Sequence, residues 1–170
     1  MRETKASDDK RRRLDREFDI IVWGASGFTG RLVTEHLYTV YGADETLRWA
    51  MAGRDLGKLE AARDELGADR IPILLGDSYD SSSLQAMATR THVICTTVGP
   101  YLKYGEQMVA ACTRAGTDYC DLTGETPFIR KMIDRYQTEA ERSGARICNS
   151  CGFDSLPSDL GTLFMQQQFN

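Results

Sequence analysis

Apolar and polar positions along this chain form short apolar runs that alternate with segments of helical spacing. The first run, Phe18 to Trp23, contains β-branched residues and no proline, as is typical of a strand buried on both faces. After it, apolar residues recur at helical spacing between Leu32 and Tyr41, which predicts a helix beginning near Phe28. The same strand-then-helix unit repeats along the chain, and this indicates an α/β domain.

Five further strands are predicted, at residues 47–52, 71–75, 92–97, 117–120 and 145–148. Further helices are predicted at residues 56–66, 83–88, 104–115 and 127–143. Strands that alternate with helices favour a doubly wound, six-stranded parallel sheet, because right-handed crossovers place helices on both faces. We therefore expect a Rossmann fold with three layers, α/β/α, and the strand order 3-2-1-4-5-6.

A glycine turn, residues 24–30, joins the first strand to its helix. This arrangement presents backbone N–H groups and a positive helix end to a pyrophosphate. The glycines follow G-x-x-G-x-x-G and not G-x-G-x-x-G, so the position after a buried strand carries more weight than the spacing, and a purely structural turn is the alternative. The candidate cofactor-binding residues of this turn are Gly24, Ser26, Gly27, Phe28, Thr29 and Gly30.

The residues after the second strand indicate which dinucleotide binds. An acidic residue at this point would accept hydrogen bonds from the ribose of NAD, but the chain has Arg54 there. Its guanidinium suits a 2′-phosphate, and Lys58 could add charge one turn further on. Asp55 is better placed to cap the following helix than to bind ribose. The pattern therefore favours NADP(H) over NAD(H).

Other loops meet at the same edge of the predicted sheet, where ligands bind in doubly wound folds. After the third strand, Asp77 and Ser78 could contact adenine, or Asp77 could cap the next helix. After the fourth strand, a loop is predicted to lie beside the cofactor, with Gly99 allowing close approach of the backbone. Its candidate cofactor-binding residues are Val98, Gly99, Pro100 and Tyr101.

Acidic residues follow the last two predicted strands. Asp121 comes after the fifth strand and Asp154 after the sixth, so both are candidates to face the nicotinamide or the substrate. Both loops are also rich in helix-capping residues, and a capping role is the alternative.

Composition limits the classes of function. The 170 residues are 41% hydrophobic, enough for one domain, and the net charge of −4 argues against nucleic acid as the main partner. Residues 1–17 carry both charge signs without apolar periodicity, so we expect a disordered leader before a domain at residues 18–170. The basic run at residues 10–13 is more simply a solvated stretch than a contact to an anionic surface. No apolar stretch is long enough to span a membrane.

The five cysteines are an odd number for a disulfide framework, so we expect them to be reduced and the protein to be cytoplasmic. Cys148 and Cys151 have C-x-x-C spacing, but no second pair accompanies them and the chain has only two histidines. No metal site is therefore predicted, and a redox pair is a minor alternative. Arg31 stands where a P-loop has lysine, and no tyrosine has a lysine four residues later, so neither ATP hydrolysis nor short-chain dehydrogenase chemistry is indicated.

The motifs also resemble a known family, the saccharopine dehydrogenase-like oxidoreductases, and within it the mycobacterial trans-acting enoyl reductases. The resemblance runs from about Phe18 to the end of the chain and rests on residues 24–30, 52–54, 97–101, 116–125 and 152–159. It implies an N-terminal Rossmann domain that binds NADP(H), followed by a larger α+β domain that holds a small-molecule or acyl substrate.

Two functions are compatible with these expectations. In the first, the chain is the cofactor-binding fragment of an NADPH-dependent reductase, similar to an enoyl reductase, whose C-terminal substrate domain is absent. In the second, it is a stand-alone dinucleotide-binding sensor or scaffold without turnover. The catalytic residues and the oligomeric state stay open.

Overall fold

A computed structural model of the protein describes residues 16–43 and 46–169. Their strands form one parallel sheet in the order β3-β2-β1-β4-β5-β6, which confirms the predicted order and fold class. The strands are β1 (Phe18–Trp23), β2 (Trp49–Gly53), β3 (Ile73–Leu75), β4 (Thr91–Thr96), β5 (Asp118–Asp121) and β6 (Ile147–Cys148). The order in which the strands are added reverses between β1 and β4, where ligands bind in folds of this kind.

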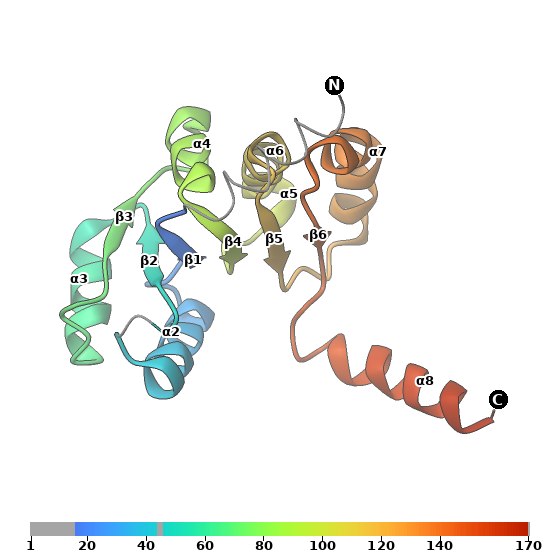
Figure 1. Ribbon diagram of the computed structural model, residues 1–170, viewed down its shortest axis with the longest axis horizontal. Coiled ribbons are helices and arrows are strands. Elements are labelled where there is room, and N and C mark those ends of the chain that lie inside the picture. Colours follow the sequence, from blue (N-terminus) through green and yellow to red (C-terminus); the bar gives the residue numbers. More distant parts are fainter. Residues whose placement is uncertain (1–15, 44–45, 170) are drawn as a thin grey trace.

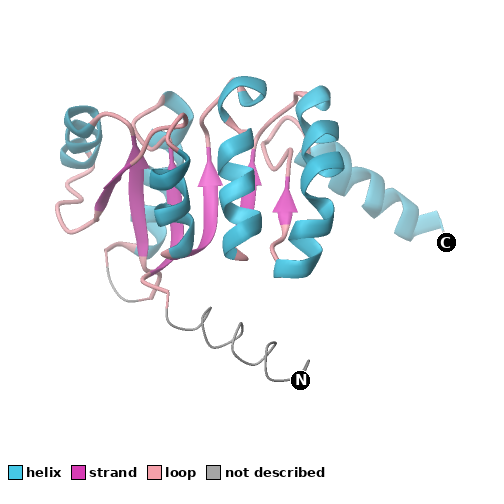
Figure 2. Ribbon diagram, turned by 90° about the horizontal axis from the view of Figure 1, so that it is seen from above, coloured by secondary structure: helices cyan, strands magenta, loops and turns pink. Residues whose placement is uncertain are grey.

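Helices cover both faces of the sheet (Figures 1 and 2). On one face lie α4 (Ser81–Thr89), α6 (Glu106–Ala115) and α7 (Thr126–Ser143). On the other face lie α2 (Phe28–Tyr41) and α3 (Leu56–Glu65). The short α5 (Tyr101–Tyr104) precedes α6, and α8 (Leu156–Phe169) follows β6.

The alternation of side chains along β1 divides the core into two clusters. Ile21 and Trp23 pack with the buried residues of α4, α6 and α7, whereas Val22 packs with Leu37 of α2 and Leu59 of α3. All three β1 side chains are at most 3% exposed. Burial on both faces explains why β1 is a continuous apolar run and not an alternating one.

The predicted helix at residues 104–115 is two helices in the structure. Helix α5 begins at Tyr101, and α6 begins at Glu106 after Gly105. The earlier start has a cause distant in sequence, because the Glu125 carboxylate accepts hydrogen bonds from the backbone N–H groups of Tyr101 (2.7 Å) and Leu102 (2.8 Å). The spacing of apolar residues within the helix cannot predict a cap from a residue so distant in sequence.

Residues 1–15 of the predicted disordered leader, including the basic run, lie outside the described residues. The last two leader residues belong to the folded domain. Arg16 is buried and donates to Thr117 Oγ1 (2.6 Å) and to the Ala115 carbonyl (2.7 Å). Glu17 forms an ion pair with Arg90 at 2.8 Å. Arg16 and Glu17, which were predicted as the end of the leader, therefore contact the folded domain.

Helix α8 extends away from the rest of the domain (Figures 1 and 2). None of its residues is buried, and its apolar side chains, such as Leu160 and Phe164, are exposed. Among the helices in the described part of the chain, none has the length and apolar character needed to cross a membrane.

Candidate functional site

The predicted glycine turn is a tight connection between β1 and α2. Gly24 has a φ of 94°, a conformation that side-chain-bearing residues rarely adopt, and its N–H donates to the Ala52 carbonyl at 2.9 Å. Gly27 N–H then donates back to the Gly24 carbonyl at 3.0 Å. The turn thus brings the N-terminus of α2 to the carboxyl end of β1.

Close packing explains why glycine stands at two of these positions. A Cβ atom at Gly30 would lie 2.0 Å from the Gly24 carbonyl oxygen. A Cβ atom at Gly24 would lie 2.7 Å from Val98 Cγ2 in the loop after β4. The turn, the helix and the β4 loop are therefore in contact at the switch point of the sheet.

The N-terminus of α2 is open to an anion. The first N–H groups of a helix have no partner within it, and here the cap residue, Gly27, offers no side-chain acceptor. The first turn also contains no acidic residue that would neutralise the positive end of the helix dipole. Ser26 and Thr29 are half-buried beside this end, and Phe28 is 84% exposed at its rim. The turn has the form of a phosphate-binding cradle.

Arg54 follows β2 at the same edge and is exposed. Its guanidinium is among the positive charges that lower the pKa of Tyr104, after the larger effect of Lys103, which hydrogen-bonds to that hydroxyl. Lys58 is exposed one turn into α3, with its Nζ 3.9 Å from Asp55. Asp55 caps α3 by accepting from the Lys58 N–H at 3.1 Å, which confirms the predicted capping role.

An aromatic pair near Arg54 was not predicted. Tyr79, which follows β3, and Tyr104, at the end of α5, pack edge to face with ring centroids 5.7 Å apart. The Lys103 ammonium lies 4.9 Å from the centroid of the Tyr104 ring. Cations and aromatic faces thus gather where β2 and β3 end. Tyr104 is the first residue of the predicted helix at residues 104–115, but Tyr79 lies outside every predicted element. Only its position in the loop after β3 could have indicated a role for Tyr79.

Asp77 and Ser78 lie half-buried in the loop after β3. The Asp77 carboxylate accepts from the Tyr79 N–H at 2.8 Å and closes a local turn. Helix α4 is capped by Asp80, which accepts from the Ser82 N–H at 2.9 Å. The alternative that Asp77 caps this helix is therefore wrong, because α4 begins later than that role requires.

The loop after β4 is fixed against the glycine turn. Thr97 N–H donates to the Trp23 carbonyl at 2.9 Å, and Val98 lies beside Gly24. Gly99 and Pro100 are exposed and are joined by a cis peptide bond. The Tyr101 ring points away from the cradle into the core, where burial raises the pKa of its hydroxyl and this hydroxyl donates to the Thr96 carbonyl at 3.0 Å.

Asp121 is buried, with 3% of its surface exposed. Its carboxylate accepts from the Tyr119 hydroxyl at 2.8 Å and from the Asn149 side-chain amide at 2.7 Å. It also accepts from the backbone N–H groups of Thr123 (3.1 Å) and Ser150 (3.0 Å). These contacts join the loops after β5 and β6, and Asn149 and Ser150 were not predicted to take part. Asp154, by contrast, is exposed just before α8.

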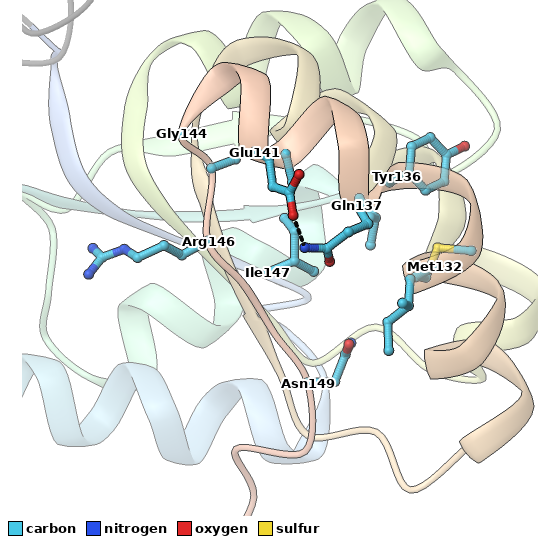
Figure 3. Close-up of a pocket in the computed structure, with 12 residues that line it drawn as sticks. Met132, Tyr136, Gln137, Glu141, Gly144, Arg146, Ile147 and Asn149 are labelled. Atoms are coloured by element: carbon cyan, nitrogen blue, oxygen red, sulfur yellow. Dashed lines mark hydrogen bonds between the residues drawn. The ribbon is translucent and has the colours of Figure 1, made fainter.

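A pocket of about 420 Å³ lies elsewhere, between α7 and β6 (Figure 3). Met132, Tyr136 and Ile147 contribute apolar surface, and at its rim the Gln137 side-chain amide donates to Glu141 at 2.7 Å. It includes none of the predicted cofactor-binding residues. The candidate site is instead formed by the glycine turn, Arg54 and the β4 loop, at the carboxyl ends of the strands.

A parallel doubly wound sheet with an uncapped glycine-rich helix N-terminus at its switch point defines a dinucleotide-binding Rossmann domain. Residues 20–148 match the family described as the saccharopine dehydrogenase NADP-binding domain, and the chain belongs to this family. The predicted family and the predicted cofactor, NADP(H), are thereby confirmed.

Relatives and solved structures agree with this assignment. The chain is 51% identical over 147 residues to a trans-acting enoyl reductase of Mycobacterium ulcerans and 52% identical over 147 residues to a putative trans-acting enoyl reductase of Mycobacterium tuberculosis. Each match covers 85% of this chain and 34% of the relative, so the chain spans about a third of their length.

Among solved structures, saccharopine dehydrogenase (L-Glu forming) from Saccharomyces cerevisiae shares the fold with a TM-score of 0.72 at 20% identity, over 89% of this chain and 31% of that one. Triphenylmethane reductase from Citrobacter, solved with NADP(H), gives a TM-score of 0.57 at 18% identity, over 77% and 48% of the two chains. The names of the relatives place this chain in an oxidoreductase family.

Proposed function

We propose that this chain is the cofactor-binding part of an NADPH-dependent reductase that reduces an unsaturated acyl substrate. The open N-terminus of α2 beside Arg54 carries the proposal, because it offers separate positive sites for a pyrophosphate and for a 2′-phosphate. The enoyl-type substrate is inferred from the names of relatives that are about 50% identical.

The residues of the chain would hold the dinucleotide in an extended pose along the sheet edge. N–H groups at the start of α2 bind the pyrophosphate, and Arg54 and Lys58 bind the 2′-phosphate. Asp77, Ser78 and the exposed Tyr79 ring border the adenine. When bound, NADPH supplies a hydride.

The β4 loop would set the position of the nicotinamide. Val98 is fixed against Gly24, and the exposed Gly99–Pro100 backbone borders the space beyond the cradle. Only the backbone of Tyr101 would contribute to this loop, because its ring is buried in the core. Asp121 acts as a positioning residue that holds the β5 and β6 loops, whereas the exposed Asp154 is free to meet a substrate held by residues outside this chain.

The test is a titration of the chain with NADPH and with NADH, followed by nicotinamide fluorescence. We expect tighter binding of NADPH, and we expect Arg54→Asp to weaken NADPH binding by about tenfold or more while changing NADH binding little. The matched control is Arg70→Asp, a charge reversal near Phe18, where the strands begin and the candidate site does not lie. Equal affinities for the two dinucleotides, or equal effects of the two variants, would exclude the assigned role of Arg54.

The alternative, a dinucleotide-binding sensor without turnover, has one observation in its favour. The buried polar groups nearest the sheet edge, the Asp121 carboxylate and the Tyr101 hydroxyl, are occupied by internal hydrogen bonds. NADPH oxidation by a full-length relative with an enoyl thioester, lost when its arginine equivalent to Arg54 becomes aspartate, would support the reductase. Binding without oxidation would support the sensor.

A further inference from the structure

Cys148 and Cys151 form a close thiol pair where β6 ends. The Cys151 thiol donates a hydrogen bond to Cys148 Sγ, with 3.4 Å between the two sulfur atoms. A disulfide bond is about 2.05 Å long, so the pair needs only a small movement to form one. Both thiols are free, and Cys148 is exposed while Cys151 is partly exposed.

The turn between the two cysteines is held by specific hydrogen bonds. Ser150 has a φ of 59°, the only positive value at a residue other than glycine in the described part of the chain. Its N–H donates to Asp121 Oδ1 at 3.0 Å, and its hydroxyl donates to the Thr123 carbonyl at 2.7 Å. The Cys151 N–H donates to the Asp121 carbonyl at 2.7 Å. The neighbouring loop thus keeps the two thiols side by side.

Two more thiols lie in the same row of the sheet. Cys95 pairs in register with Cys120, and Cys120 with Cys148. Cys95 and Cys120 are fixed within neighbouring strands and are less exposed than Cys148. The described residues contain no group of three or more side chains placed to hold a metal ion, so the row does not form a metal site there.

We propose that Cys148 and Cys151 are a redox-active dithiol site, which a low-molecular-weight disulfide converts reversibly into an intrachain disulfide. The Cys148 thiolate attacks one sulfur of the reagent, whose S–S bond breaks and releases one thiol. Cys151 then loses its proton and attacks Cys148 Sγ, which releases the second thiol. The chain loses two electrons and two protons, and the reagent gains them.

The order of the two attacks follows from the surroundings of each sulfur. Cys148 is the more exposed of the two thiols, so a reagent in solution reaches it first. Burial, followed by the hydrogen bond to Cys148, raises the pKa of Cys151 to about 11, so this thiol remains the protonated donor until the mixed disulfide forms. Neither step involves a dinucleotide, and the site is independent of the proposed function.

Incubation of the chain with oxidised glutathione, alkylation of the remaining thiols with iodoacetamide and digestion with trypsin test the site. Cleavage after Arg146 gives a peptide that contains both cysteines. We expect this peptide to lose two hydrogen atoms and to escape alkylation at both sulfurs, and we expect dithiothreitol to reverse the change. In Cys151→Ser, one glutathione should stay attached to Cys148.

The control variant is Cys120→Ala, which removes the other thiol adjacent to Cys148 in register and should leave the Cys148–Cys151 disulfide unchanged. A disulfide from Cys148 to Cys120, or full alkylation of both cysteines in the wild-type chain after incubation, would overturn the proposal. The wild-type peptide decides this question even if a variant fails to fold.

Discussion

Gly30, in the first turn of α2, lies against the backbone of Gly24, so that a Cβ atom at position 30 would stand 2.0 Å from the Gly24 carbonyl oxygen. No real Cβ atom tolerates that separation, and the obstacle is backbone that cannot rotate away. The contact fixes the angle at which α2 leaves β1, and with it the direction of the helix N-terminus.

Gly30→Ala is therefore expected to lower the free energy of unfolding by about 2 kcal/mol, because α2 must move away from the sheet. Gly57→Ala is the matched control, since its Cβ would lie 3.7 Å from the nearest atom, on the exposed side of α3. It should keep or slightly raise stability. Chemical denaturation measures the stability of the two variants. Equal midpoints would show that α2 can shift to accommodate the new Cβ without loss of stability.

Gly27 allows a test of the cradle with two variants of the same shape. Its backbone is extended, with φ −76° and ψ 167°, which suits a residue with a capping oxygen. An added Cβ would lie 3.3 Å from the Gly24 carbonyl oxygen, so both variants need the same small shift of the turn. Gly27→Asp and Gly27→Asn have the same shape and should cap α2 about equally well. Only aspartate adds a negative charge at the pyrophosphate position, so we expect NADPH to bind it about tenfold more weakly than Gly27→Asn. Equal affinities would place the pyrophosphate elsewhere.

The order of the sheet and the glycine turn were predictable because both depend on local sequence. The apolar run at β1 and the helical spacing after it lie within twenty-five residues of one another, and parallel topology then determines which loops share an edge. Arg54 could be placed at that edge for the same reason, since it directly follows β2.

The roles of the acidic residues in these loops were not predictable. Glu125 caps α5 from the loop after β5, and Asp121 binds groups from residues 149 and 150. The roles of Glu125 and Asp121 depend on how deeply each side chain is buried and on which loop it contacts. Neither the burial nor the contact can be inferred from the neighbouring sequence. An aspartate after a strand has the same sequence signal whether it faces a ligand or joins two loops.

The Glu125 cap leads to a prediction about the β4 loop. Glu125→Ala removes two charge-assisted acceptors from the backbone N–H groups of Tyr101 and Leu102, and we expect a loss of about 1–3 kcal/mol in the free energy of unfolding. Glu65→Ala breaks only an exposed ion pair with Arg31 and should cost less than about 1 kcal/mol. Urea denaturation compares them, and equal losses would show that the cap contributes little.

Glu106 links stability to pH. On α6, its carboxylate forms ion pairs with Lys131 (2.5 Å) and Arg135 of α7, and first the Lys131 hydrogen bond, then that of Arg135, lower its pKa. The unfolded chain therefore binds a proton at this group at higher pH than the folded chain does. The stabilisation is complete above the unfolded pKa of about 4.3 and disappears as the pH falls through the lower folded pKa.

Between about pH 6 and pH 3, the wild-type chain should accordingly lose more free energy of unfolding than Glu106→Gln, which has no carboxylate to protonate at this position. The control is Glu60→Gln, at an exposed position on α3, whose acid-side decline should follow that of the wild type. Urea denaturation at a series of pH values gives each curve. If Glu106→Gln and Glu60→Gln decline in parallel with the wild type, the ion pairs between α6 and α7 are not coupled to folding, and other carboxylates determine the acid sensitivity of the domain.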